Sequence, residues 1–135
     1  MYKRQDHGRA INPAIERGQI EGGFVQGAGW LTIEEVNWKP NGELTTHSPS
    51  TYKIPAVNDM PEKFNVNIFK NTNRENVVNK SKTTGEPPLM LGMSVFFAIK
   101  DAIASIGNYK ITPIINAPAT SEKILMSVKN LEKRI

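Results

Sequence analysis

Apolar or small residues between positions 89 and 106 recur every three or four places, the spacing of one helix face; they are Leu89, Gly92, Phe96, Ile99, Ile103 and Ile106. Pro87 and Pro88 occupy the opening turn, where a missing N–H group costs little. We predict one helix that ends at Gly107 in the left-handed conformation. Because Lys100 and Asp101 are its only interior charges, we expect this helix to be largely buried.

Two more helices are predicted from their capping residues. Asn12 followed by Pro13 is typical of a helix start, and the pattern continues to about residue 30. Each glycine inside this helix lowers its stability by roughly 0.5–1 kcal/mol relative to Ala; the five are Gly18, Gly22, Gly23, Gly27 and Gly29. A last helix is expected from Thr120 or Ser121, as N-cap, to about Asn130.

Polar and apolar residues alternate in two other segments, 31–38 and 63–70, which predicts strands. An Asn-Gly pair at 41–42 favours a tight turn, so the first strand is predicted to return in a β-hairpin. Together these elements predict an α+β fold, a single domain over residues 1–135 in which helices pack on a small antiparallel sheet.

Composition restricts the classes of site. The 135 residues include no Cys, which excludes disulfides, thiolate metal sites and a cysteine nucleophile. His7 and His47 are far apart in the sequence, so we predict no metal site built from this chain alone and expect both to be surface residues. The net charge of +4 comes from scattered lysines, which argues against nucleic-acid binding.

No segment has the pattern expected of a membrane span, which needs about 18 apolar residues in a row. The charged start lacks the apolar run of a secretory signal. We therefore expect a cytoplasmic protein that does not contact a membrane.

Glu86 is the first candidate for chemistry, because it lies between Gly85 and two prolines at the start of the apolar helix. The prolines lack the amide donors that a capping carboxylate would engage, and Gly85 allows close approach from outside. A carboxylate in such a partly desolvated place can serve as a general base. The alternative is a structural acid in the first turn that favours the helix dipole.

Gln19 is the second candidate, since it lies beside Gly18 in the glycine-rich helix. Its amide can bond a polar cofactor, or it can satisfy a buried loop instead. The glycines spaced four apart, Gly18 with Gly22 and Gly23 with Gly27, allow either a flat ligand or a neighbouring helix or strand to approach the backbone. Their spacing matches neither a dinucleotide fingerprint nor a phosphate loop.

Several blocks of the sequence resemble the C-terminal part of the molybdenum-binding subunit of the xanthine dehydrogenase/aldehyde oxidase family. They are GRAINPAI at 8–15, RGQIEGGFVQGAGWLTIEEV at 17–36, STYKIPA at 50–56 and SKTTGEPPLMLGMSVFFAIKDAI at 81–103. Residues 1–5 look like a divergent start outside this resemblance. The resemblance implies a molybdopterin-binding domain.

The resemblance also implies a role for each candidate residue. Glu86 stands at the position of the family's general base, which takes a proton from a molybdenum-bound hydroxyl. Gln19 stands at the position of a glutamine that approaches the molybdenum centre, and Gly85 belongs to the same cofactor-binding motif as Glu86. The molybdenum is held through the pterin, so no metal ligand is implied in this chain.

In the family, the residues that orient the substrate and most of the pterin contacts lie upstream of the region that matches. The chain is therefore predicted to be a fragment or a small subunit of an enzyme that oxidises hypoxanthine and xanthine toward urate, with water as the oxygen source. Its implied partners are the remainder of the molybdenum subunit and the FAD and iron–sulfur parts. Alone, it is expected to be inactive and to self-associate. The alternative is an inactive truncated paralogue that serves as a subunit-interaction or ligand-binding module.

Overall fold

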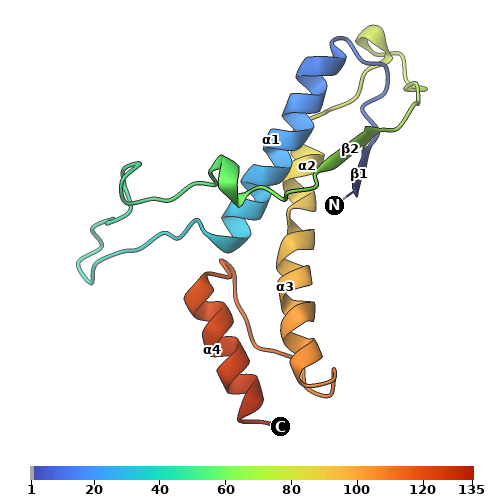
Figure 1. The fold of residues 1–135 in the computed structure, drawn as a ribbon. Coiled ribbons are helices and arrows are strands. Elements are labelled where there is room, and N and C mark those ends of the chain that lie inside the picture. Colours follow the sequence, from blue (N-terminus) through green and yellow to red (C-terminus); the bar gives the residue numbers. More distant parts are fainter. Residues whose placement is uncertain (1) are drawn as a thin grey trace.

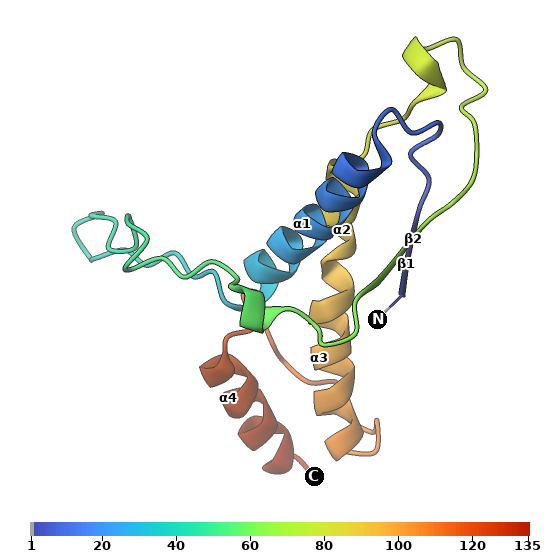
Figure 2. The same ribbon diagram turned by 45° about the horizontal axis from the view of Figure 1, so that its top comes forward.

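The computed structural model describes residues 2–135 and is helix-rich, as two views show (Figures 1 and 2). In chain order the elements are β1 (Tyr2–Gln5), α1 (Pro13–Thr32), β2 (Asn65–Ile68), α2 (Glu86–Leu91), α3 (Met93–Ile106) and α4 (Ser121–Glu132), with short 3-10 turns at Val57–Asp59 and Val78–Lys80. α1 packs against α2 and α3, and α4 lies beside the lower part of α3 (Figure 1).

α1 begins where the capping pattern predicts. The side chain of Asn12 accepts hydrogen bonds from the amides of Ala14 and Ile15, each at 3.2 Å. Further along, Phe24 is buried, and its ring centroid lies 5.4 Å from that of Phe64, just before β2. The same helix is thereby fixed at its start by a cap and in its middle by an aromatic contact.

The single helix predicted after Pro87 is two helices in the structure, α2 and α3, which meet at Gly92. Gly92 has φ −54° and ψ −25°, which are helical values, so the interruption is slight. Gly107 ends α3 with φ −92°, and the predicted left-handed cap is wrong. A Cβ at Gly107 would lie 3.1 Å from Cδ2 of Leu131 on α4, a tight contact, so the glycine at this position serves close packing rather than a positive φ.

The prediction that this apolar helix is largely buried is wrong for the chain alone. Along α2 and α3 the side chains of Met90, Met93 and Phe97 are 55%, 44% and 59% exposed. The run Glu86–Ile106 has mean hydropathy 1.7 over its most apolar window, of which 11% is buried. By length and composition alone this run is apolar enough to cross a membrane, although Glu86, Lys100 and Asp101 interrupt its apolar residues.

The sheet is smaller than predicted, and its strands are parallel rather than antiparallel. β1 pairs with β2 in register from Tyr2 opposite Asn65 to Gln5 opposite Ile68. The predicted strand at 63–70 therefore exists, shortened, but its partner comes from the start of the chain. No strand was predicted for that start, which the sequence marked only as a divergent segment.

The predicted hairpin is mostly irregular. α1 continues through Thr32, and residues 33–56 then form an arm that projects away from the helices (Figures 1 and 2). Trp38 and Leu44 form an isolated antiparallel bridge in the arm. They lie on either side of a turn in which Gly42 has φ +84°. At its base the Tyr52 hydroxyl donates to Oε2 of Glu34 at 2.5 Å, and this bond raises the pKa of Tyr52.

α4 starts after Thr120, whose hydroxyl accepts the amide of Lys123 at 3.4 Å, as its capping role predicts. The preceding loop is tied to the end of α1, because the amide of Ala119 donates to the carbonyl of Leu31 at 2.7 Å. The hydroxyl of the buried Ser127 donates to the carbonyl of Ile114 at 2.9 Å. These bonds connect the C-terminal helix to the rest of the chain.

Among residues 6–135, for which burial is described, the buried apolar core is small for a chain of this size; it consists of Ile20, Phe24, Val66, Ile103, Ala119 and Leu131. The chain has a mass of 15.0 kDa and an accessible surface of 9515 Å². A compact monomer of that mass exposes roughly 7,000 Å². The excess surface indicates that this chain leaves uncovered a face that a self-contained domain would bury.

Candidate functional site

A pocket of about 340 Å³ lies where the glycine-rich face of α1 meets the start of α2. We call it the α1–α2 pocket; its lining residues are Gly18, Gln19, Gly22, Gly23, Gln26, Gly85, Glu86 and Leu89. It brings together Gln19, Gly85 and Glu86, the three residues that the sequence selected from segments more than sixty positions apart.

The four spaced glycines divide into two pairs with different surroundings. A Cβ at Gly23 would lie 2.9 Å from the carbonyl oxygen of Gly85, and one at Gly27 would collide with the backbone of Leu89. A Cβ at Gly18 or Gly22 would meet no atom within 4 Å. Close packing of helices therefore explains Gly23 and Gly27. Gly18 and Gly22 line open space in the pocket. For these two glycines, the interpretation that they let a flat ligand approach the backbone therefore still applies.

The polar side chains of the pocket are without protein partners among residues 2–135. Gln19, Gln26 and Glu86 are exposed, and their side chains make no hydrogen bond or ion pair within the part of the chain that the structure describes. Oε1 of Gln19 lies 4.0 Å from the Cβ position of Gly85, so the amide is directed toward the loop that carries Glu86. The partly desolvated setting expected for Glu86 is not present in this chain alone.

Glu86 opens α2 without help from a cap. The N-cap residue is Gly85, which makes no side-chain capping bond, and Pro87 and Pro88 follow. Glu86 is therefore not a capping residue, as its sequence context indicated. Its carboxylate is therefore not used to cap the helix.

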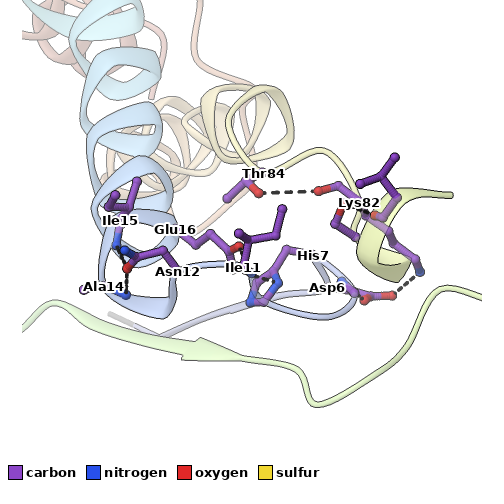
Figure 3. A network of polar contacts seen from close by, with 12 residues as sticks. Asp6, His7, Ile11, Asn12, Ala14, Ile15, Glu16, Lys82 and Thr84 are labelled. Atoms are coloured by element: carbon purple, nitrogen blue, oxygen red, sulfur yellow. Dashed lines mark hydrogen bonds and ion pairs between the residues drawn. The ribbon is translucent and has the colours of Figure 1, made fainter.

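A turn far away in the sequence holds the segment that leads to Glu86 (Figure 3). Gly8 and Ser81 form an antiparallel bridge, and the amide of Lys82 donates to the carbonyl of His7 at 2.8 Å. Oδ2 of Asp6 lies 2.6 Å from Nζ of Lys82. The sequence does not mark Asp6 or Lys82 as site residues. Neither belongs to a catalytic pattern, and the two residues are seventy-six positions apart.

His7 is buried, with 2% exposure, and the expectation that it lies on the surface is wrong. Its Nδ1 lies 3.1 Å from Oε2 of Glu16 in the first turn of α1, an ion-pair distance without hydrogen-bond alignment. Oε1 of the same carboxylate accepts the amide of Ile11 at 2.7 Å. His47, by contrast, is exposed on the arm, with Nδ1 3.1 Å from the carbonyl oxygen of Leu44. Neither histidine lines the α1–α2 pocket.

The chain is similar to known proteins in sequence. Residues 1–61 match the family model described as a molybdopterin cofactor-binding domain. The chain is 49% identical over 125 residues to the xanthine dehydrogenase/oxidase of Felis catus, covering 88% of this chain and 9% of that protein. It is 46% identical over 133 residues to the xanthine dehydrogenase of Oryza sativa subsp. japonica, covering 90% of this chain and 10% of that protein.

Solved structures agree with the sequence matches. Quinoline 2-oxidoreductase from Pseudomonas putida 86 superposes with a TM-score of 0.80 at 29% identity, over 95% of this chain and 16% of that one. A Cu,Mo-CO dehydrogenase superposes with a TM-score of 0.79 at 20% identity, over 99% of this chain and 16% of that one, which supports the fold.

The fold and the matched residues 1–61 resemble the molybdopterin-binding part of molybdenum hydroxylases. In sequence the chain is similar to xanthine dehydrogenases over 88% to 90% of its length, as the resemblance of its motifs indicated. The chain spans about a tenth of the length of the curated relatives that it matches.

Proposed function

We propose that this chain supplies one wall of the active site of a xanthine dehydrogenase-like molybdenum hydroxylase, with Glu86 as general base and with Gln19 and Gly85 as cofactor contacts. The observation that carries the proposal is the α1–α2 pocket, which these three residues line beside two glycines, Gly18 and Gly22, where an added Cβ would meet nothing within 4 Å. The similarity of the chain to xanthine dehydrogenases supports the choice of cofactor.

The residues of the pocket fit a flat, polar cofactor. The amides of Gln19 and Gln26 offer donors and acceptors that are unpartnered within residues 2–135. Gly18 and Gly22 leave the α1 backbone open to a planar ring. No cluster of three or more His, Asp or Glu side chains that could hold a metal occurs among the described residues.

When bound, the molybdenum–molybdopterin group supplies the oxidising centre for a purine carbon. Glu86 then accepts a proton at its carboxylate oxygen, and the open Gly85 lets the reacting groups come close. Gln19 orients the cofactor through its side-chain amide. The remainder of the protein covers the pocket, which excludes water from the Glu86 carboxylate and strengthens its interactions.

The proposed substrates are hypoxanthine and xanthine, which are oxidised toward urate with water as the oxygen source. Electrons leave through iron–sulfur and FAD groups in other parts of the assembly. The proposed partner of this chain is the remainder of the molybdenum subunit, and the proposed location is the cytoplasm. The residues of this single domain provide the base, and the partner provides the substrate pocket.

The proposal is tested in a chimaera, a xanthine dehydrogenase whose matching segment is replaced by this chain. The chimaera is expected to contain molybdenum and to oxidise xanthine. Glu86→Gln keeps the size of the side chain but cannot accept the proton, so turnover should fall about 10²- to 10⁴-fold with unchanged molybdenum content.

Glu122→Gln is the matched control, because Glu122 is also an exposed acid in the first turn of a helix and lies outside the pocket. It should leave turnover unchanged. Near-normal xanthine oxidation by a molybdenum-loaded Glu86→Gln chimaera would refute the role of Glu86. A folded chimaera without molybdenum would favour the inactive-paralogue alternative.

A further inference from the structure

The start of α2 lacks the local interactions that usually fix a helix end. Its N-cap, Gly85, offers no side chain, and Pro87 and Pro88 provide no amide hydrogens. The first backbone bond of the helix, from the amide of Leu89 to the carbonyl of Gly85, is long at 3.4 Å. The position of Glu86 therefore depends on what holds the residues on either side of it.

On the C-terminal side, packing of α2 against α1 provides that support, because Gly23 and Gly27 leave no space for a side chain between the two helices. On the N-terminal side the chain is the polar segment 71–84, which contains one short 3-10 turn. Loops of this kind are mobile unless they are tied to the body of the protein.

Asp6 provides that tie. Its Oδ2 accepts a hydrogen bond from Nζ of Lys82 at 2.6 Å (Figure 3). The same oxygen accepts one from Nδ2 of Asn71 at 3.0 Å, and its Oδ1 accepts one from the amide of Gly8 at 3.1 Å. One carboxylate thus joins both ends of the polar loop to the turn at residues 6–9. These bonds lower the pKa of Asp6 to about 2, so the carboxylate keeps its charge well below neutral pH.

Backbone pairing adds to the charge contact. The amide of Arg9 donates to the carbonyl of Lys80 at 3.1 Å, and the amide of Lys82 donates to the carbonyl of His7 at 2.8 Å. Gly8 has φ +68°, and a Cβ there would collide with the carbonyl oxygen of Lys80. The turn can therefore lie this close to residues 80–82 only with glycine at position 8.

The same turn also determines where α1 begins. His7 contacts Glu16 in the first turn of α1, and Asn12 caps that helix a few residues after the turn. α1 carries Gln19, and the segment after Lys82 carries Glu86. A single turn is thus connected to both walls of the α1–α2 pocket.

We propose that Asp6 and Lys82 are positioning residues, which hold the Glu86 loop at a fixed place relative to Gln19 on α1. This inference rests on the proposed function for its consequence in catalysis, but its structural content concerns the chain alone. Neither residue lines the pocket, so each acts through the backbone of residues 82–86.

The structural content is tested by amide hydrogen exchange in the 135-residue chain, measured on peptides that cover residues 83–92. Lys82→Met removes the charge but keeps most of the apolar stem, and exchange in these peptides should become roughly two- to fivefold faster. Lys82→Arg keeps a donor for Asp6 and should restore slow exchange. Asp6→Asn, which nearly preserves shape, should act like Lys82→Met.

Lys80→Met is the matched control, because Lys80 lies two residues away and donates to the carbonyl of Glu75 rather than to a carboxylate. It should leave exchange at 83–92 unchanged. Unchanged exchange in both Lys82→Met and Asp6→Asn, or equal acceleration in Lys80→Met, would overturn the proposal.

The catalytic consequence is tested in the chimaera. Lys82→Met should lower kcat with little change in KM for xanthine, and Lys82→Arg should recover most of the loss, because a displaced base slows proton transfer more than it weakens binding. A loss of kcat in Lys82→Met that Lys82→Arg does not recover would contradict positioning by the Asp6–Lys82 pair. If Glu86→Gln is fully active while the exchange results hold, the proposed function fails and the structural inference stands.

Discussion

Gly27 on α1 and Gly92 at the junction of α2 and α3 face each other across the crossing of these helices. A Cβ at Gly92 would lie 2.6 Å from the amide nitrogen of Ala28 and 2.8 Å from Cα of Gly27. A Cβ at Gly27 would collide with the backbone of Leu89. The two helices are therefore in backbone contact, and Leu89, which takes part in this contact, also lines the α1–α2 pocket.

Gly27→Ala is expected to destabilise the chain by about 1–3 kcal/mol, because the added methyl group must push the two backbones apart. The free energy of unfolding from urea denaturation measures this effect. Gly22→Ala is the matched control on the same helix, where a methyl group meets nothing within 4 Å. It should stabilise the chain by about 0.5–1 kcal/mol through helix propensity. Equal destabilisation by both substitutions would contradict the division of the glycines.

Gln19→Ala should leave the melting temperature of the isolated chain nearly unchanged, because the amide has no partner among the described residues. In the chimaera the same substitution should reduce molybdenum content or turnover, since a hydrogen bond to the cofactor is lost. Asn130→Ala, which removes an exposed amide from α4, serves as the control for both measurements. A large fall in melting temperature with full molybdenum content would make Gln19 a structural residue.

Helix starts could be predicted from the sequence because their signals are local. Asn12 and Thr120 cap α1 and α4 through bonds to amides two or three residues away. The arm could not be predicted in this way. Residues 31–38 alternate as a strand does, but they have no neighbouring strand along most of their length, and the first two positions continue α1.

Features that depend on contacts between residues far apart in the sequence were also missed, because the sequence signals are local. β2 pairs with a segment about sixty residues earlier in the sequence, and nothing in either strand specifies parallel pairing. Gly107 has the sequence context of a helix cap, but the positive φ angles fall on Asn108 and Tyr109, and Gly107 instead makes room for Leu131. At the site, Gln19 and Glu86 were found from motifs, whereas the Asp6–Lys82 contact appears only in three dimensions.

The low pKa of Asp6 predicts that the free energy of unfolding of the chain decreases at acid pH. Its pKa is about 2 in the folded state, against 3.8 for an unperturbed Asp, so the charged carboxylate stabilises the folded chain. The stabilisation by Asp6 should be complete above pH 3.8 and should disappear as the pH falls through 2. Urea denaturation of the wild type and of Asp6→Asn from pH 6 to pH 2 measures the difference, which should shrink only in that window.

Lys82→Met provides the check on cause, because the hydrogen bond from Lys82 is the largest contribution to the low pKa of Asp6. In this variant the pKa of Asp6 should move back toward 3.8, as followed by the carboxyl carbon shift in an NMR titration. A titration of Asp6 at the same pH in the wild type and in Lys82→Met would show that the pair does not control this carboxylate.

The isolated chain is expected to self-associate and to bind no molybdenum. Phe97 on α3 is 59% exposed and Met93 is 44% exposed, and the total accessible surface of 9515 Å² exceeds that of a compact monomer of this mass, roughly 7,000 Å². In the isolated chain the remainder of the protein does not cover this apolar helix face. The face is expected to contact a second copy of the chain instead. Sedimentation velocity should therefore show concentration-dependent species larger than 15.0 kDa, and elemental analysis should find no molybdenum. Replacing Met93 and Phe97 by Ser should shift the distribution toward monomer without changing the fold seen by circular dichroism, because neither side chain belongs to the buried core. A monomeric wild-type chain that retains molybdenum would show that the segment needs no covering partner.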